Sequence, residues 1–275
     1  MKIAVHQMTS GIEPSRNVVA IDAAIADSAR KGAVMYFAPE MSFLVDRDRG
    51  RARQHIELES QTTGLVQLCA SAARHGIWLH LGSIAVLHEN GEKLANRTIV
   101  IGADGTIKGQ YDKMHLFDVD LASGESWRES SAYVGGEQPV VVQTPIGLMG
   151  LAICYDMRFP DLFSAYAKAG VDVITLPSAF TVPTGEAHWH NLLRTRAIET
   201  ESFVIAAAQC GHHDDGRNTF GHSLVVDPWG TVLLDMGMSP GLAFVDLDLS
   251  RIIDVRSQIP VHKNRRAIPP VFIAE

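Results

Sequence analysis

One cysteine stands where a reactive thiol is expected. Cys154 follows the apolar run 148–153, and a helix is predicted to begin a few residues later. A thiol at the end of a buried strand lies beside free backbone N–H groups and near the positive end of the next helix, and both favour the thiolate. Arg158 adds a cation nearby, and the N–H groups of such a turn can hold an oxyanion. The alternative is a buried core cysteine, which is an equally common fate for a free thiol.

Two further charged residues follow predicted strands. Glu40 comes directly after the apolar run 33–38 and Pro39, so its carboxylate is poorly solvated and suits a general base. Lys113 closes a predicted hairpin region, where a lysine can bind a developing oxyanion. Each alone is also compatible with an ordinary surface residue. Because sites in α/β proteins gather at the carboxyl ends of strands, the three residues are candidates for a nucleophile, a base and an oxyanion partner.

The remaining cysteines and histidines give weaker signals. Cys69 lies among leucines on a predicted helix and Cys210 ends a predicted strand, so packing is the expected role of both, although Cys210 is close enough to a strand end to approach the site. His188 and His190 are two apart on a predicted helix and point in different directions, which does not suit a metal pair. The pair His212–His213 has no accompanying Cys/His ligand spacing, so we expect no metal.

The composition is that of a globular protein. Of the 275 residues, 46% are apolar and 20% are charged, and the apolar runs are too short to span a membrane. The net charge of −7 argues against nucleic acid as a partner. Three widely spaced cysteines form no disulfide framework, and no signal-peptide pattern precedes the first strand, so we expect a cytoplasmic protein. No linker or repeat interrupts the sequence, which favours one domain over residues 1–275.

The elements that must position these residues are strands alternating with helices. Strands are predicted at 2–8, 33–38, 77–87, 94–101, 107–111, 140–143, 148–154, 171–176, 203–209, 223–227, 231–235 and 243–247, and helices at 17–31, 65–74, 161–169 and 186–202. This order is typical of an α/β fold with mixed sheets. The strands are about twice as many as one modest sheet holds, which favours two packed sheets with helices outside.

Taken together, the motifs resemble the nitrilase superfamily of carbon–nitrogen hydrolases. The resemblance extends from Lys2–Met8 to Gln258–Val261, and its three main motifs follow the order of the family: Pro39-Glu40, Tyr111–Leu116 and Cys154–Pro160. It implies a four-layer αββα sandwich of two mixed β-sheets with outer helices. It also implies no metal or organic cofactor, and assembly into a homodimer or a larger homo-oligomer.

The resemblance assigns roles to individual residues. It implies a catalytic set of Glu40, Lys113 and Cys154, with Glu129 as a second glutamate in the pocket. The backbone N–H of Tyr155 would share the oxyanion with the lysine. The expected reaction is hydrolysis of a small amide through a thioester on the cysteine.

Further segments resemble one branch of this superfamily. Residues 184–189, 194–199 and 206–211 are similar to the deaminated-glutathione amidases, and 221–230 is similar to these and to the omega-amidases. Glu186 departs from the pattern, because these relatives more often carry proline there. The branch implies hydrolysis of deaminated glutathione to 2-oxoglutarate and cysteinylglycine. The alternatives are 2-oxoglutaramate or another small amide or carbamoyl compound.

A substrate with carboxylate groups requires cationic or N–H donors. Arg158, close behind the cysteine, and Arg194 and Arg196, on the helix that follows the His188 segment, are the candidates, with His188 as a further binding residue. Two other classes of protein remain to be weighed. An isochorismatase-like cysteine amidase requires an Asp–Lys–Cys order that this sequence satisfies poorly, and a non-catalytic binding protein has no need for all three reactive groups.

Overall fold

The strands form two six-stranded β-sheets in a computed structural model that describes residues 1–89, 91–120, 124 and 126–274. The first sheet has the order β16 (Gly241–Asp246), β1 (Lys2–Gln7), β2 (Met35–Phe37), β3 (Trp78–Leu87), β4 (Leu94–Ile101) and β5 (Ile107–Asp112). The second has the order β15 (Val232–Asp235), β14 (Leu224–Val226), β11 (Phe203–Ala206), β10 (Val173–Thr175), β9 (Gly147–Leu151) and β8 (Val140–Thr144).

Both sheets are mixed, and both have the same pattern of pairing. Three neighbouring strands are parallel in each sheet, namely β1, β2 and β3 in the first and β9, β10 and β11 in the second. All other neighbours are antiparallel. Parallel strands require helical crossovers, so each half of the chain contributes a β-α-β-α-β series to the fold.

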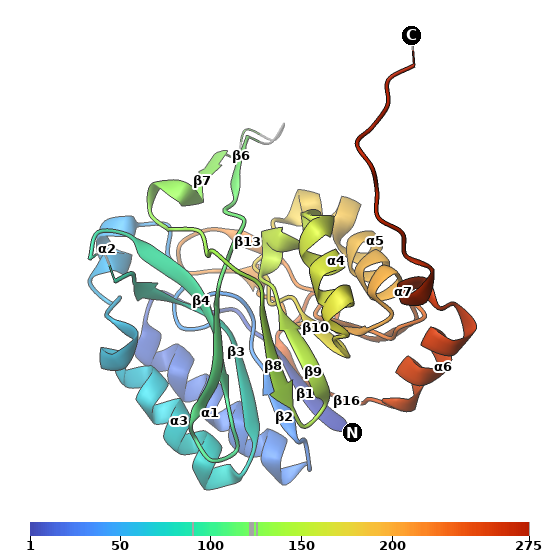
Figure 1. Ribbon diagram of the computed structural model, residues 1–275. Coiled ribbons are helices and arrows are strands. Elements are labelled where there is room, and N and C mark those ends of the chain that lie inside the picture. Colours follow the sequence, from blue (N-terminus) through green and yellow to red (C-terminus); the bar gives the residue numbers. More distant parts are fainter. Residues whose placement is uncertain (90, 121–123, 125, 275) are drawn as a thin grey trace.

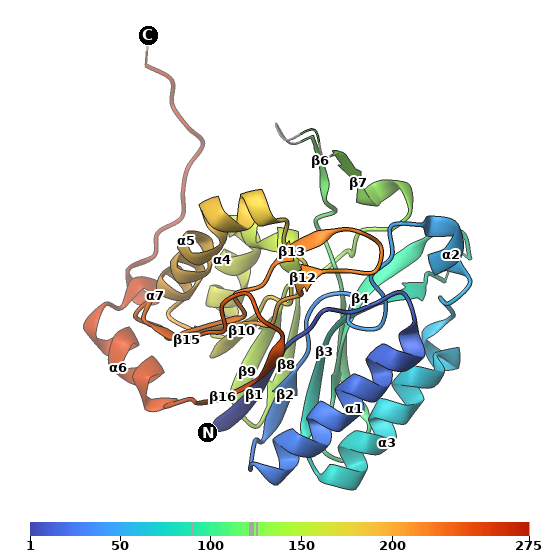
Figure 2. The same cartoon turned by 180° about the vertical axis from the view of Figure 1, so that it is seen from behind.

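The crossover helices form the two outer layers. Helices α1 (Pro14–Arg30) and α3 (Thr63–His75) cover the first sheet, and α4 (Pro160–Ala169) and α5 (Val182–Thr200) cover the second (Figures 1 and 2). Val5 and Phe37 of the first sheet and Leu151 and Val173 of the second belong to one buried cluster. This arrangement confirms the predicted four-layer sandwich of two mixed sheets.

The helix starts differ from the prediction for one physical reason. Helix α1 begins at Pro14 and not at residue 17, and α5 begins at Val182, four residues before the predicted Glu186. Each has proline in its first turn, where the missing N–H would have no intrahelical partner in any case. The predicted strand 148–154 is also shorter, because β9 ends at Leu151.

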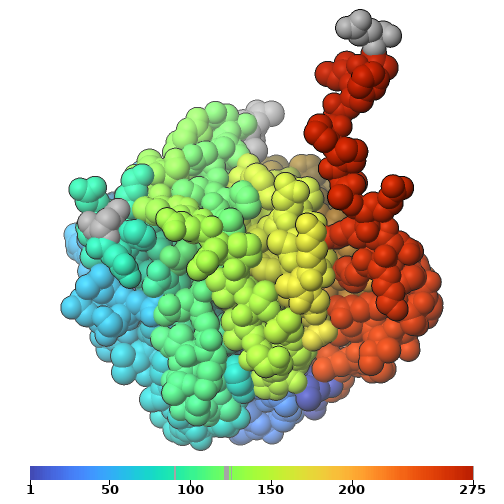
Figure 3. Space-filling view, in the orientation of Figure 1, coloured from blue at the N-terminus to red at the C-terminus, as the bar shows by residue number. Residues whose placement is uncertain are grey.

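Several short elements were not predicted. They are the helices α2 (Arg49–Arg53), α6 (Ser250–Gln258) and α7 (Val261–Asn264), the hairpins β6 (Asp118–Asp120) with β7 (Ser126–Arg128) and β12 (Cys210–His212) with β13 (Asn218–Phe220), and the 3₁₀ helices Glu59–Gln61, Glu129–Ser131 and Cys154–Arg158. Beyond α7 the chain extends away from the body, as the space-filling view shows (Figure 3). Within the described residues, no helix is long and apolar enough to cross a membrane.

Candidate active site

Three side chains that the sequence singled out meet at one end of the sandwich. Glu40 follows β2, Lys113 follows β5 and Cys154 follows β9. The Lys113 Nζ lies 3.0 Å from the Glu40 Oε1 and 2.9 Å from the Glu129 Oε2, so the second predicted glutamate belongs to the same cluster. Glu40, Lys113 and Cys154 are all buried. The structure therefore brings together a thiol, two carboxylates and one ammonium group that are distant in the sequence.

Two groups that the sequence did not indicate fix the Glu40 carboxylate. The Asn96 Nδ2 donates to its Oε1 over 3.0 Å, and the backbone N–H of Ala179 donates to its Oε2 over 2.8 Å. Asn96 is followed by the polar residues Arg97 and Thr98 in β4, so its type and position did not distinguish it in the sequence. Ala179 carried no signal, because a backbone donor can belong to any residue. Together with Lys113 they leave the carboxylate one orientation.

Glu129 holds the other side of the lysine. It opens a 3₁₀ helix, and its Oε2 also accepts the backbone N–H of Phe117 over 2.7 Å. Asn96 reaches its Oε1 over 3.2 Å, so this amide donates to both glutamates. Lys113 thus lies between two carboxylates whose positions are themselves fixed by hydrogen bonds.

The charges of the cluster determine its protonation. Burial by itself lowers the pKa of Lys113, but the carboxylates of Glu129 and Glu40 outweigh it and hold that pKa well above the ordinary value. Burial raises the pKa of the Cys154 thiol well above its ordinary value, and the charge of Glu40 adds to this effect, while Lys113 opposes it. The resting centre therefore contains an ammonium group and a neutral thiol, which must lose its proton when it attacks.

The turn at Cys154 differs from the expected one. Helix α4 begins only at Pro160, and Cys154 starts a 3₁₀ helix of five residues, so no long helix directs its dipole at the sulfur. The expectation of a thiolate favoured by the helix dipole is therefore wrong for the resting state. Cys154 has a φ of 45°, a strained backbone conformation for a residue with a side chain, and its N–H donates to the carbonyl of Pro177 over 3.0 Å. Tyr155 follows in the same turn, and its role as an oxyanion donor stays a prediction.

Asp156 connects this turn to the lysine segment. Its Oδ2 accepts the N–H of Ile153 over 2.8 Å and the hydroxyl of Tyr111 over 2.7 Å. Its Oδ1 accepts the backbone N–H of His115 over 3.0 Å and lies 2.7 Å from the Nδ1 of the same histidine. The side chain is fully buried. One carboxylate therefore ties the residues on both sides of Lys113 to the turn that carries the cysteine.

The four predicted substrate-binding residues differ in their position and in their contacts. Arg158 donates to the His188 Nδ1 over 3.3 Å and lies 5.6 Å above the ring of Phe180, the residue after Ala179. Arg194 instead donates to the carbonyl of Gly230. Arg196 is buried, where it donates to the carbonyl of Met157 and pairs with Glu199. Because internal bonds hold the buried guanidinium group of Arg196, it is not available to a ligand. Arg194 is exposed and uses only its Nε in the bond to Gly230, so it stays a candidate together with Arg158 and His188.

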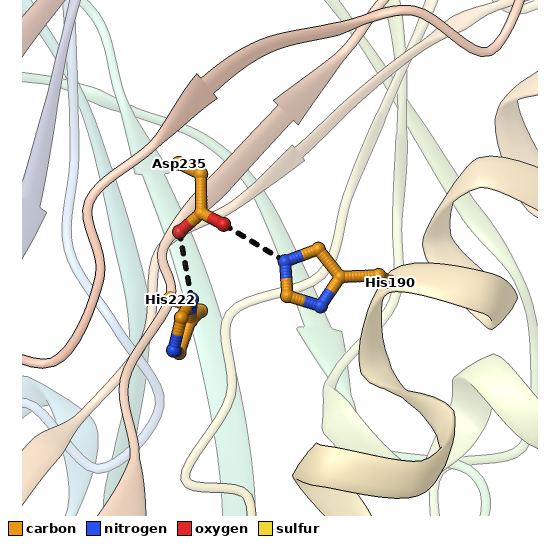
Figure 4. A group of neighbouring side chains, drawn as sticks. All are labelled: His190, His222 and Asp235. Carbon is orange, nitrogen blue, oxygen red and sulfur yellow. Dashed lines mark hydrogen bonds and ion pairs between the residues drawn. The ribbon is translucent and has the colours of Figure 1, made fainter.

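The described residues contain one group of side chains with the donor atoms of a metal site, and the sequence did not indicate it. His190 on α5 and His222 in the turn before β14 contact opposite oxygens of Asp235, over 2.9 and 2.8 Å (Figure 4). These hydrogen bonds hold the cluster together and tie α5 to the edge of the second sheet. His188 points to Arg158 instead, so the two helix histidines do diverge as expected.

The other residues considered from the sequence have structural contacts. His213 is buried between the carbonyl of Ser10 and the hydroxyl of Thr219. The Cys210 Sγ lies 3.5 Å from the hydroxyl of Thr9 and is buried, and Cys69 packs against the core under α1 and α3. None of these contacts is with Glu40, Lys113 or Cys154.

Known proteins are similar to this chain in sequence and in fold. Residues 2–257 match the family model described as carbon-nitrogen hydrolase. The chain is 40% identical over 278 residues to the deaminated glutathione amidase of Bos taurus, covering 96% of this chain and 81% of that protein. The Caenorhabditis elegans NitFhit protein superposes with a TM-score of 0.89 at 36% identity, covering 96% of this chain but 65% of that one.

A second similar structure is a mutant of the amidase from Nesterenkonia sp. AN1, which shows the result of Michael addition of acrylamide at the active site cysteine. It superposes with a TM-score of 0.79 at 28% identity and covers 96% of this chain and 99% of that one. The fold, the family model and the buried cluster of thiol, carboxylates and ammonium agree. The chain belongs to the carbon–nitrogen hydrolase family of the nitrilase superfamily, whose members hydrolyse amide and related bonds.

Proposed function

We propose that the protein is a cysteine-dependent amidase that cleaves deaminated glutathione into 2-oxoglutarate and cysteinylglycine. The observation that carries the chemistry is the position of Lys113 between Glu40 and Glu129, beside the buried thiol of Cys154. The substrate class is supported by the curated relatives, of which several mammalian ones bear the name deaminated glutathione amidase.

The first half of the proposed reaction forms a thioester. The Cys154 sulfur attacks the amide carbon while Glu40 takes the thiol proton. The oxyanion that forms is bound by Lys113 and the backbone N–H of Tyr155. Glu40 then donates the proton to the nitrogen as the carbon–nitrogen bond breaks, and the amine leaves. The raised pKa of Cys154 supports this order, because the thiol stays neutral until a base takes its proton.

The second half returns the enzyme to its resting state. Glu40 takes a proton from water as the oxygen of that water attacks the thioester carbon. The sulfur then leaves as the carbon–sulfur bond breaks and takes the proton back from Glu40, which releases the carboxylic acid and restores the neutral thiol. Glu129 keeps Lys113 in place in both halves, because its carboxylate pairs with the ammonium group. We assign no proton transfer to Glu129. Arg158, with His188 beside it, is the proposed partner for the carboxylate of the 2-oxo acid part.

Turnover of three compounds tests this proposal. We expect a higher kcat/KM for deaminated glutathione than for 2-oxoglutaramate, and no turnover of aliphatic nitriles. Cys154→Ala should abolish all activity while the fold persists, and Glu40→Gln and Lys113→Met should each lower kcat by about a hundredfold or more. Activity of Cys154→Ala would contradict the chemistry, whereas a preference for 2-oxoglutaramate would contradict only the substrate.

Alkylation of the cysteines separates an enzyme from a non-catalytic protein on this scaffold. Iodoacetamide should label Cys154 before Cys69 and Cys210, because Cys154 alone has a carboxylate, that of Glu40, proposed to take its proton as the sulfur attacks. Deaminated glutathione should slow that labelling. The three positions are resolved by mass spectrometry of peptides. Equal labelling of all three cysteines in the folded protein would argue against a special environment of Cys154.

We also propose that the enzyme works in the cytoplasm as a homodimer or a larger homo-oligomer. Ile268, Val271, Phe272 and Ile273 are at least 83% exposed on the extended C-terminal segment, and such an apolar run is expected to be covered by another surface (Figure 1). Light scattering of the purified protein measures its mass directly. A mass near 30 kDa would contradict the assembly.

A further inference from the structure

A cavity of about 500 Å³ lies between the start of α5 and the β12–β13 hairpin. Its walls include the charged residues Arg47, Glu186 and Arg217 and the apolar residues Pro183, Phe220 and Met238. A volume of this size is within the range of small-molecule sites, as is a lining that combines apolar surface with a few charged groups.

One short segment separates the cavity from the catalytic cluster. Ala179 donates its N–H to Glu40, and the carbonyl of the next residue, Phe180, accepts the N–H of Phe220 over 3.0 Å. Pro183, at the end of this segment, lines the cavity. The stretch 179–183 therefore has the Glu40 carboxylate at its start and the cavity at its end, and Phe220 in the cavity wall is bonded directly to it.

A row of rings makes a second connection. The Arg217 guanidinium lies 5.3 Å above the ring of Trp127, whose centroid is 6.3 Å from that of Phe117. The ring centroid of Phe117 lies in turn 5.0 Å from that of Tyr155, with the two rings edge to face. Tyr155 is the residue directly after the nucleophile Cys154. Two series of contacts thus connect the cavity wall to the catalytic cluster, one through the backbone of residues 179–183 and one through aromatic packing.

The charges of the cavity leave one cation available. Arg217 pairs with Asp215 over 2.7 Å, so its charge is compensated within the protein. Arg47 is exposed, and it makes no hydrogen bond or ion pair with any described residue. A guanidinium group in this state suits a carboxylate of the ligand, to which it can donate two parallel hydrogen bonds. Glu186 contributes a negative charge to the same wall.

We propose that this cavity binds the amine part of the substrate and that Arg47 binds the carboxylate of that part. The inference rests on the proposed function. In deaminated glutathione the amine part is a dipeptide that ends in a carboxylate, whereas in 2-oxoglutaramate it is ammonia. A dipeptide released by hydrolysis carries an ammonium group as well as a carboxylate, which a wall with Arg47 and Glu186 matches in sign. Arg47 is therefore a specificity-determining residue for the leaving group and has no role toward the acyl part.

Two substrates that share the acyl part test the assignment. Arg47→Gln should raise KM for deaminated glutathione about tenfold or more, because a charged hydrogen-bond partner is lost. For 2-oxoglutaramate kcat/KM should stay within twofold. Arg47→Lys should recover part of the affinity. Arg53→Gln is the matched control, since Arg53 is in the same segment but donates to the carbonyl of Ile56 outside the cavity.

A binding measurement keeps the test valid even if the substrate assignment fails. Cysteinylglycine is titrated calorimetrically into Cys154→Ala and into the double variant with Arg47→Gln, so no turnover is needed. About tenfold weaker binding to the double variant supports the subsite. Equal binding of cysteinylglycine to the two variants overturns the subsite. An equal loss of kcat/KM for deaminated glutathione and 2-oxoglutaramate in Arg47→Gln overturns it as well. The proposed function fails separately, if the wild-type enzyme does not turn over deaminated glutathione.

Discussion

Replacement of Asp156 by asparagine should damage both stability and catalysis, although the two side chains have nearly the same shape. Each carboxylate oxygen accepts from one backbone N–H, that of Ile153 on one side and that of His115 on the other. An asparagine has one carbonyl oxygen and one NH₂ group. Whichever way the amide is turned, its NH₂ faces a backbone N–H, so no orientation avoids an opposition of two donors.

The magnitude follows from the bonds that are lost. A hydrogen bond to a charged acceptor contributes about 1.5–3 kcal/mol, and a buried N–H left without a partner costs about 1–3 kcal/mol. Asp156→Asn should therefore lower the free energy of unfolding by about 3–5 kcal/mol. The same carboxylate holds Tyr111 and His115, on both sides of Lys113, against the turn of Cys154. A displacement of about 1 Å between such groups lowers rates about a hundredfold, so kcat should fall by that factor while KM changes little.

Urea unfolding followed by circular dichroism measures the change in the free energy of unfolding. Steady-state kinetics measure the change in kcat, with saturating substrate and at a temperature where the variant is folded. Asp161→Asn is the matched control, because Asp161 is exposed in the first turn of α4 and should contribute less than about 1 kcal/mol. If Asp156→Asn unfolds within 1 kcal/mol of the wild type and keeps its kcat, the network does not position the lysine and the reasoning is refuted.

Three further outcomes are expected. Gly82→Ala should lower the free energy of unfolding by about 1–3 kcal/mol and should lower kcat at least tenfold. The reason is that the new Cβ would collide with the carbonyl oxygens of Ala38 and Pro39, just before Glu40. Unchanged kinetics would contradict this expectation. Burial lowers the pKa of His80 in the folded protein to about 3, whereas the same side chain has a pKa near 6.5 in the unfolded chain. As pH falls below 6.5 the unfolded chain therefore binds the proton first, and the folded state loses stability. At pH 5 this loss is about 2 kcal/mol, and urea unfolding of His80→Gln should show a smaller pH dependence than that of the wild type. Dialysis against EDTA should leave turnover unchanged, and activity restored only by zinc would instead implicate His190, His222 and Asp235.

The order of elements and the main reactive residues could be predicted from the sequence. Periodicities of apolar residues are local, so the strands and the four long helices were found, with errors mainly where a proline opens a helix, as at Pro14. Glu40, Lys113 and Cys154 were identifiable because each follows a strand, and the carboxyl ends of parallel strands meet at one edge. The family resemblance then added Glu129.

Only the tertiary structure decided what surrounds these residues. The Ala179 N–H that fixes Glu40 is 139 positions away in the sequence, and the bonds of Asp156 reach back 41 and 45 positions to His115 and Tyr111. Two arginines illustrate the same difference between sequence and structure. Arg196 was predicted from the sequence to bind a ligand, but its side chain is buried and forms hydrogen bonds within the protein. Arg47 was not indicated by the sequence, but it lines the cavity. The reason is physical: a sequence pattern reports which face of its own element a side chain occupies, but the partner on that face belongs to another layer and is selected by packing across the sandwich.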